Sequence, residues 1–344
     1  MKVFLTGGTG FIGQPLTQAL LDLGWAVRVL VRHPESPQAA RLTALGAQCV
    51  QGDILDPESI KAGMEGANLV VHNAGMYELG VDAAGRKRMA DINERGTENV
   101  LLAAKALGIP RTVYVSTAAY WGETGDEVWD ETAVRKVPSG NFYEDTKTRA
   151  HDFALAQIRN GQPLIIVCPG QVIGPNDHSV FGYFIRMYLN RIMPPFGWAP
   201  EAVNTYTYVD DMANGIALAA QKGRVGETYI IAGEIMTKRT LLNIWTQKPG
   251  AAQSWIYLPV WLAKIMFAPM APLLRWLKLP AFISSETING DVNRRFSSAK
   301  AQQELGWTFR SGEQIWLDTL TKEQALLEKR KGQTLLERLK PLEE

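Results

Sequence analysis

The feature that most constrains the fold of this chain is a regular alternation of short apolar segments with segments of helical periodicity. KVFLT (2–6) and AVRVLV (26–31) are typical of short buried strands, and FIGQPLTQALLDLG (11–24) has the spacing of an amphipathic helix. Because parallel strands are joined by crossover helices, this order predicts an α/β fold with a doubly wound parallel sheet. Further strands are expected at 47–53, 68–73, 111–117 and 163–169, and further helices at 37–45, 86–107 and 143–159.

A glycine-rich loop, TGGTGFIG (6–13), joins the first expected strand to the first expected helix. It contains Gly8-x-Gly10-x-x-Gly13 and the wider spacing Gly7-x-x-Gly10-x-x-Gly13. Glycines at these positions permit a tight turn, close approach of the backbone to a pyrophosphate, and close packing of helix on strand. The free N–H groups at a helix N-terminus also attract phosphate. The loop therefore predicts a Rossmann fold that binds a dinucleotide.

The end of the second strand indicates which dinucleotide is preferred. NAD-binding proteins usually have an acidic residue there, which accepts a hydrogen bond from the ribose 2′-OH. Here the residues are Val31, Arg32 and His33, and a guanidinium at Arg32 would instead pair with a 2′-phosphate. We therefore expect NADP(H) as the preferred cofactor, NAD(H) as the alternative, and Asp53 beside the adenine.

Composition and charge favour a soluble globular protein. Of the 344 residues, 46% are hydrophobic and 21% charged, and the net charge of +1 gives no reason to expect a nucleic-acid partner. Two cysteines, Cys49 and Cys168, provide no disulfide framework, and MKVFLTGG lacks the pattern of a signal peptide. A cytoplasmic location is therefore expected. The four histidines form no metal-ligand pattern, so no metal is expected.

The length suits a main domain with a smaller, discontinuous C-terminal domain that binds the substrate. The charged C-terminal segment, which includes EKRK, is expected to be a solvated surface helix. The expected boundaries are 1–175 and 205–234 for the Rossmann domain, 176–204 and 235–312 for the substrate domain, and 313–344 for a helical tail.

The stretch WIYLPVWLAKIMFAPMAPLLRWLKLPAF (255–282) is strongly apolar. Lys264, Arg275, Lys278 and four prolines interrupt it, so no charge-free run reaches the ~18–20 residues that a membrane span needs. One interpretation is the core and wall of a small domain. The others are a helix in peripheral contact with a membrane surface and a lid over an apolar substrate.

The segment FYEDTK (142–147) has a lysine four residues after a tyrosine, a spacing that places both side chains on one face of a helix. Reduction of a carbonyl needs a hydride donor and an acid that protonates the developing alkoxide. An ammonium group at Lys147, together with the charge of an oxidised nicotinamide, would lower the pKa of Tyr143 from its usual value of about 10. The alternative is a surface tyrosine with a lysine at this spacing by chance.

An ordered set of motifs resembles the extended short-chain dehydrogenase/reductases over about residues 1–310. Within that family the chain is most similar to the branch of dihydroflavonol reductases, 3β-hydroxysteroid dehydrogenases and hopanoid-associated epimerases. Dimers are common in the family, so a homodimer is one assembly that the resemblance implies. Besides the glycine loop, the motifs are QGDILD (51–56), VVHNAG (70–75), DINERGTENVLLAA (91–104), YVSTAAYWGE (114–123), YEDTK (143–147), CPGQVIGP (168–175), YTYVDD (206–211) and FSSAKAQQELGW (296–307).

The resemblance implies a catalytic set of Thr117, Tyr143 and Lys147. Tyr143 would be the acid and base, Lys147 would tune it and hold the nicotinamide ribose, and Thr117 would orient the substrate oxygen. Ser116 is a secondary candidate for the hydroxyl, and Asn93 matches the family's helix asparagine, for which a structural role is the alternative. The residues expected to bind the cofactor are Thr6, Gly7, Gly8, Thr9, Gly10, Phe11, Ile12, Gly13, Arg32, Asp53, Ile54, Asn73, Ala74, Gly75, Asn93, Ser116, Tyr143, Lys147, Pro169, Gly170 and Val172.

Departures from the family pattern narrow the substrate class. Sugar-nucleotide members often have an asparagine after the sixth strand and an arginine just before the VDD turn, and this chain has neither at the matching place. Trp121 replaces the usual tyrosine of the family's V-Y-G segment, a change without an assigned consequence. The segments 176–203 and 235–290 are rich in Phe, Met, Trp and Pro, which favours an apolar substrate.

These observations predict an NADP-preferring oxidoreductase that interconverts a carbonyl and a secondary alcohol on a flavonoid-, steroid- or terpenoid-like molecule. One alternative is a nucleotide-sugar epimerase or dehydratase on the same scaffold. Another is a non-catalytic protein that senses the cofactor, although the intact tyrosine and lysine argue against it.

Overall fold

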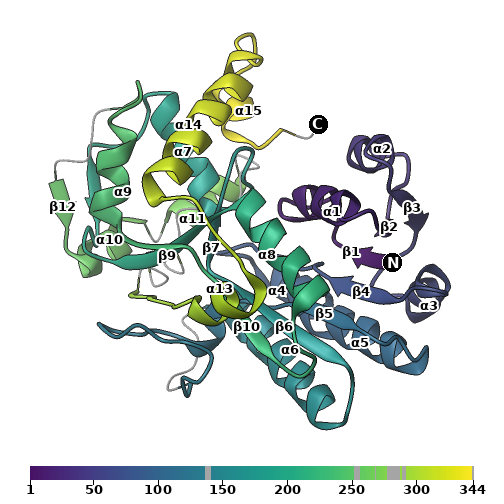
Figure 1. Cartoon of the computed structure of the whole chain (residues 1–344). Coiled ribbons are helices and arrows are strands. Elements are labelled where there is room, and N and C mark those ends of the chain that lie inside the picture. The colour runs from purple at the N-terminus through teal and green to yellow at the C-terminus, as the bar shows by residue number, and fades with distance from the viewer. Residues whose placement is uncertain (136–140, 252–255, 268, 277–286, 289–291, 343–344) are drawn as a thin grey trace.

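The computed structural model describes residues 1–135, 141–251, 256–267, 269–276, 287–288 and 292–342. Its centre is a seven-stranded sheet in the order β10-β6-β5-β4-β1-β2-β3, with every neighbouring pair parallel (Figure 1). The prediction of a doubly wound parallel sheet is confirmed. The strands are β1 (Lys2–Thr6), β2 (Ala26–Val31), β3 (Gln48–Gln51), β4 (Leu69–His72), β5 (Thr112–Val115), β6 (Leu164–Pro169) and β10 (Thr228–Ile231).

Helices cover both faces of this sheet because the strands are apolar on both sides. In β1, Val3 and Leu5 pack in one buried cluster and Phe4 in another, as expected from the alternation of side chains along a strand. The first cluster includes residues of α1 (Gly13–Asp22), α2 (Pro37–Ala44), α8 (Val209–Lys222) and α13 (Ala299–Leu305). The opposite face is covered by α3 (Pro57–Met64), α5 (Gly96–Ala106) and α6 (Phe142–Arg159).

The helix expected at 86–107 is interrupted by one turn of wider winding. It consists of α4 (Ala83–Ala90), a π-helical turn (Asp91–Arg95) and α5. π-Helical turns often occur at functional sites. This one contains Asn93, whose buried side chain is described below.

The second half of the chain adds two smaller sheets. One has the order β11-β9-β7 and the other pairs β12 with β8. Residues 205–208 of β9 lie in the first of these sheets although the expected boundaries assign them to the Rossmann domain, and the division into domains stays a proposal. The elements are β7 (Gln171–Ile173), β8 (Phe196–Trp198), β9 (Val203–Tyr208), β11 (Glu234–Thr237), β12 (Ile256–Leu258), α7 (Val180–Leu189) and α9 (Lys238–Trp245).

The C-terminal segment forms α14 (Gly312–Glu328) and α15 (Leu335–Leu339). The expectation of a helix is met, but the helix is not solvated all round, because one face of α14 is buried, with Ile315, Trp316 and Leu320 fully inaccessible. In Figure 1, α14 lies beside α7 and α9, against which it packs. Apolar residues recur along α14 at helical spacing, and they determine its placement more than the charges of EKRK do.

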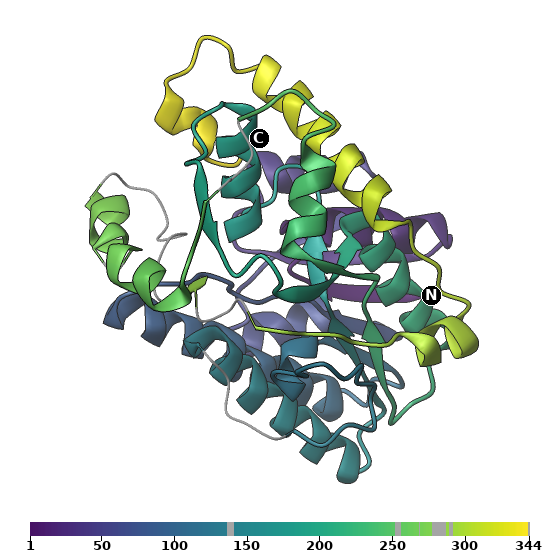
Figure 2. The same ribbon diagram turned by 90° about the vertical axis from the view of Figure 1, so that its left-hand side faces the viewer.

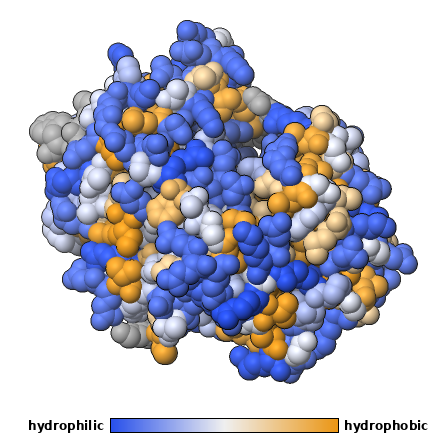
Figure 3. All heavy atoms as spheres, viewed as in Figure 1, coloured by the Kyte–Doolittle hydropathy of each residue, from blue (hydrophilic) through white to orange (hydrophobic). Residues whose placement is uncertain are grey.

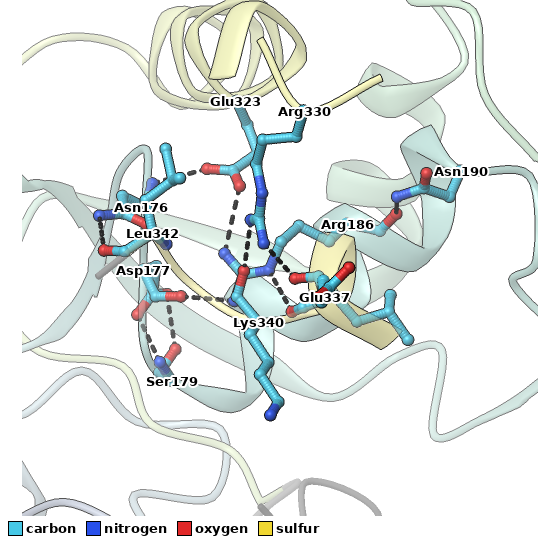
Figure 4. A network of polar contacts seen from close by, with 11 residues as sticks. Asn176, Asp177, Ser179, Arg186, Asn190, Glu323, Arg330, Glu337, Lys340 and Leu342 are labelled. Carbon is cyan, nitrogen blue, oxygen red and sulfur yellow. Dashed lines mark hydrogen bonds and ion pairs between the residues drawn. The ribbon is translucent and has the colours of Figure 1, made fainter. Parts of the chain in front are cut away.

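A polar network ties this segment to α7. The guanidinium of Arg186 is fully buried and donates to the carboxylate of Glu323 at 3.2 Å and to the carbonyl oxygens of Leu339 and Asp177 at 2.6 and 2.8 Å (Figure 4). Asn176 exchanges two hydrogen bonds with the backbone of Leu342. The tail is therefore part of the packed structure.

The apolar stretch forms β12, α10 (Val260–Phe267) and α11 (Met270–Trp276), and its residues 255, 268 and 277–282 lie outside the described residues. Ala263, Phe267 and Leu274 pack in a buried cluster, in agreement with the core-and-wall interpretation. Trp261 and Trp276 are 64% and 78% exposed. Within the described part of the chain, no helix is sufficiently long and apolar to span a membrane.

Candidate active site

A cavity of about 1150 Å³ opens at the carboxyl ends of β1, β4, β5 and β6, where ligands bind in open α/β sheets. The order of the strands reverses here, because β1 lies between β4 and β2. The glycine loop and the residues after β2 and β3 line one part of the cavity. Aromatic and aliphatic residues of the second half also line the cavity, including Phe181, Phe184, Trp198, Leu242 and Phe267.

The glycine loop has the geometry that the sequence predicts for a phosphate cradle. Gly7 has φ of 75°, and the N–H of Gly10 donates to the carbonyl of Gly7 at 3.2 Å. A Cβ at Gly13 would lie 1.9 Å from that carbonyl, and a Cβ at Gly8 would lie 2.6 Å from the side chain of Val29. Gly8 and Gly13 thus allow the loop to pack, whereas Gly7 and Gly10 line the cavity.

The N-terminus of α1 has no side-chain cap. The N–H of Gln14 donates to the carbonyl of Gly10 and Pro15 has no N–H, so in the first three helical residues the N–H of Gly13 is the donor left for an external acceptor among the described residues. The residues present therefore fit the pyrophosphate of a dinucleotide. The other predicted cofactor residues that line the same cavity are Thr9, Phe11, Ile12, Arg32, Asp53, Ile54, Asn73, Ala74, Gly75, Ser116, Pro169, Gly170 and Val172.

Tyr143 and Lys147 both line the cavity from the first turns of α6, as does Thr117 after β5. The helix begins here because the side chain of Asn141 accepts the N–H of Glu144 at 2.9 Å. The buried ammonium of Lys147 donates to the carbonyl of Val115 at 2.9 Å. The structure thus brings the three predicted catalytic side chains to one cavity.

The two candidate hydroxyl groups differ in their partners. Thr117 Oγ1 accepts the N–H of Ala119 at 3.2 Å and caps the short 3₁₀ helix Ala118–Trp121. The Oγ of Ser116 is 2.8 Å from Nδ1 of His151 and is buried. Since burial lowers the pKa of His151 to about 3, that imidazole is neutral and can share a proton with the serine.

Burial dominates the protonation of the central pair. It lowers the pKa of Lys147 to about 8 and raises the pKa of Tyr143 well above its usual value. The ring of Tyr77, whose centre is 4.7 Å from that of Tyr143, adds to the rise, and the charge of Arg294 opposes it. In the protein alone, desolvation thus outweighs the attraction of Arg294. The lowering expected from Lys147 together with an oxidised nicotinamide stays a prediction.

Asn93 and Thr6 lie behind the cavity wall. Asn93 accepts the N–H of Met76 at 2.7 Å and donates to the carbonyl of Met76 and to Thr146 Oγ1 at 3.0 and 2.9 Å. It thereby fixes the loop after β4 against α6. Thr6 Oγ1 is 2.7 Å from Nδ1 of His72. These contacts give both residues structural roles.

Arg32 and Asp53 occupy the places expected for contact with the adenosine half. Arg32 is exposed and makes no hydrogen bond or ion pair with the residues that the structure describes. The carboxylate of Asp53 accepts the N–H of Leu55 at 2.9 Å.

In the same described part, no group of His, Cys, Asp and Glu side chains has the arrangement of a metal site.

The sequence did not indicate an ion pair at the cavity wall, between Glu144 and Arg294. The two groups are 2.6 Å apart, and their side chains are 5% and 15% exposed. Arg294 and Arg295 are consecutive in the sequence, but Arg295 instead pairs with Asp126 at 2.8 Å. No local signal distinguishes the two arginines, so only the fold shows which one faces the cavity.

The fold and the cavity define a Rossmann-type α/β protein with a dinucleotide cradle at the switch point of its sheet. Residues 3–232 match the NAD dependent epimerase/dehydratase family, and the chain belongs to this family. The resemblance to the extended short-chain dehydrogenase/reductases, and to their reductase and hydroxysteroid-dehydrogenase branch, is confirmed.

The chain is similar to three relatives over most of its length. A Synechocystis sp. protein whose name includes dihydroflavonol 4-reductase is 33% identical, covering 88% of this chain and 89% of the relative. The 4-hydroxy-2-methyl-3-oxo-4-farnesyl-3,4-dihydroquinoline-1-oxide ketoreductase of Stigmatella aurantiaca is 30% identical, covering 93% and 96%. The 3 beta-hydroxysteroid dehydrogenase/Delta 5-->4-isomerase of Mycobacterium tuberculosis is 28% identical, covering 89% and 85%.

The fold is also similar to solved structures. The crystal structure of gox2253 has a TM-score of 0.79 and 28% identity, covering 96% of this chain and 99% of that one. A dTDP-glucose 4,6-dehydratase from Streptomyces venezuelae, solved with NAD and TYD bound, has a TM-score of 0.74 at 23% identity, covering 96% and 98%. At 23% identity, the similarity to the dehydratase shows the fold alone.

Proposed function

We propose that the protein is an NAD(P)-dependent oxidoreductase that interconverts a carbonyl and a secondary alcohol on a largely apolar small molecule. The observation that carries this proposal is the position of Tyr143, Lys147 and Thr117 in the wall of one cavity, which the glycine loop also lines. The relatives named as a ketoreductase and a hydroxysteroid dehydrogenase support the same reaction type.

Each residue would have a separate role in the reaction. When bound, the nicotinamide supplies a hydride to the carbonyl carbon or accepts one from the alcohol. Tyr143 donates the proton that the carbonyl oxygen needs, and its raised pKa keeps the phenol protonated at neutral pH. The ammonium of Lys147 favours the phenolate that forms, and Thr117 orients the oxygen. In the alcohol-to-ketone direction Tyr143 takes the proton back.

An apolar substrate of the flavonoid, steroid or terpenoid kind is supported by the aromatic wall, where Phe181, Trp198 and Phe267 line the cavity. NADP(H) is proposed as the preferred cofactor because the exposed guanidinium of Arg32 is available to a 2′-phosphate, as the adjoining strand end has no acid. A homodimer and a cytoplasmic location stay predictions.

The experiment begins with calorimetric titration of NADPH and NADH into the wild-type protein, and tighter binding of NADPH is expected. Equal affinities would contradict the role given to Arg32. A panel of apolar ketones and UDP- and dTDP-sugars is then followed by absorbance of the reduced cofactor. Turnover of a nucleotide sugar but of no apolar ketone would instead support the epimerase or dehydratase alternative.

Tyr143→Phe is the matched variant for this panel. We expect kcat to fall by roughly 10²- to 10⁴-fold, because the proton donor is lost, while the affinity for NADPH stays close to that of the wild type. If the variant bound the cofactor and retained wild-type turnover, Tyr143 would not be the acid.

A further inference from the structure

We propose that Arg294 recognises a carboxylate that the substrate has close to its reacting carbon. This inference rests on the proposed function and narrows its substrate class, from an apolar carbonyl compound or alcohol to an apolar oxo or hydroxy acid.

The guanidinium is fixed in the cavity wall by contacts on two sides. The backbone of Arg294 is bound to β9. Its backbone N–H donates to the carbonyl of Val203 at 2.8 Å, and its backbone carbonyl accepts from Thr205 Oγ1 at 2.9 Å. At the other end, one terminal nitrogen donates to Glu144 at 2.6 Å. Asn141 donates to the same oxygen of Glu144 at 2.8 Å and orients the carboxylate.

This position is next to the proposed proton donor. Glu144 follows Tyr143 on α6, and both line the cavity with Arg294. The charge of Arg294 also acts on the pKa of Tyr143 against the effect of burial, which requires proximity. A group bound to this guanidinium would therefore lie close to the carbonyl or alcohol that Tyr143 protonates or deprotonates.

The guanidinium has donors that the protein does not use. An arginine has five N–H donors, and among the described residues the one side-chain hydrogen bond of Arg294 is to Glu144. Its Nε is buried without a hydrogen-bond partner. Because Nε is inaccessible, the donors open to an external acceptor in the cavity are the remaining terminal N–H groups of the guanidinium.

The surroundings favour an anion on an otherwise apolar molecule. Phe181, Phe184, Trp198 and Phe267 line the same cavity as Arg294. In a wall of low polarity, a planar guanidinium binds a carboxylate through parallel hydrogen bonds and offsets its desolvation. The rest of the molecule would contact the aromatic side chains.

The test compares 3-hydroxydodecanoate with its methyl ester, which differ in the charge of one group. Oxidation of both by NADP⁺ is measured in the wild type, in Arg294→Gln and in the control Arg295→Gln, whose arginine pairs with Asp126. We expect the wild type to prefer the acid in kcat/KM by roughly 10- to 100-fold. Arg294→Gln should abolish this preference by losing activity on the acid alone, and Arg295→Gln should keep it.

A purely structural role would produce a different pattern. If Arg294→Gln lowered kcat/KM for acid and ester by the same factor, or if the wild type showed no preference, the inference would be overturned. Should Arg294→Gln fail to fold, Arg294→Lys retains the charge without the planar donors, and the same loss of preference is expected on a smaller scale. An unchanged preference in that variant would also overturn the inference.

Calorimetric binding of the same acid and ester in the presence of NADP⁺ separates this inference from the proposed function. Preferential binding of the acid that depends on Arg294, without turnover of either compound, would support the inference and contradict the oxidoreductase proposal. Equal turnover of both compounds would support the oxidoreductase proposal and contradict the role given to Arg294.

Discussion

At the scale of single residues, burial determines the chemistry of the site more than sequence spacing does. The sequence predicts the pairing of Tyr143 and Lys147, and the structure places both in one cavity wall. The rise in the pKa of Tyr143 in the protein alone could not be predicted, because it depends on desolvation by residues far apart in the chain. The position of Arg294 could not be predicted either. Arg294 lines the cavity because its backbone is bound to β9, a contact that its neighbours in sequence do not indicate.

A pH profile tests this protonation scheme. Lys147 is charged below its pKa of about 8 and becomes neutral as the pH rises through that value. Tyr143 stays protonated in this range because its pKa is raised. We therefore expect kcat/KM for ketone reduction to decline above about pH 8.

The variant Lys147→Arg tests whether Lys147 is the group whose titration lowers kcat/KM. Its guanidinium does not titrate in this range, so any residual activity should lack the decline near pH 8. A decline at the same pH in this variant would assign the titration to another group.

At the scale of elements, the buried ion pair of Arg186 and Glu323 holds together two segments that are distant in sequence. It joins α7 to α14, and Arg186 also bonds the carbonyl of Asp177, a residue of the cavity wall (Figure 4). Burial of both side chains means that neither charge has water to replace a lost partner.

Glu323→Ala should therefore destabilise the fold by about 3–5 kcal/mol, since it leaves a charged guanidinium buried without its carboxylate. The matched control is Glu201→Ala, which removes the partner of Arg239 in an ion pair whose side chains are 68% and 47% exposed. That change should cost less than about 1 kcal/mol. Urea denaturation measures the free energy of unfolding of both variants. Equal losses would show that the buried pair stabilises the fold no more than the exposed pair does.

Elements with local signals were predictable, and those that depend on distant pairing were not. The six strands expected in the first half agree with β1 to β6 to within a few residues, because most of them contain a short apolar run, although β3 (QCVQ) does not. α3 was missed although Asp56 and Pro57 provide a cap and a first helical residue. The three-residue strands β7, β8 and β12 have no pattern of their own and form through partners elsewhere in the chain.

At the scale of the whole molecule, α10 and α11 stand at its edge, as the green helices on the left of Figure 2. Their inner face contributes Phe267 to the cavity, and their outer face exposes Trp261, Ile265 and Trp276. The view in Figure 3 is largely hydrophilic, with smaller hydrophobic patches. Exposed tryptophans beside the cavity motivate a test of the alternative interpretation, peripheral contact with a membrane surface, which stays a prediction.

Vesicle sedimentation tests this contact. We expect the wild type to sediment with vesicles of phosphatidylcholine and phosphatidylglycerol, and Trp261→Ser/Trp276→Ser to do so several-fold less, because the interfacial side chains are lost. Leu102→Ser, at a 47% exposed position of α5, is the control and should behave as the wild type. Sedimentation of the double variant to the wild-type extent would contradict membrane contact through these helices.

The attachment of the tail through Leu339 and Leu342 has a consequence for biosynthesis. A ribosome makes β1 to β10, and with them the whole parallel sheet and the glycine loop, before it reaches residue 232. The carbonyls that Arg186 and Asn176 require are made about a hundred residues later, at 339 and 342. A nascent chain can therefore assemble its dinucleotide cradle early, while α7 and the adjoining wall obtain their final partners only when synthesis is almost complete.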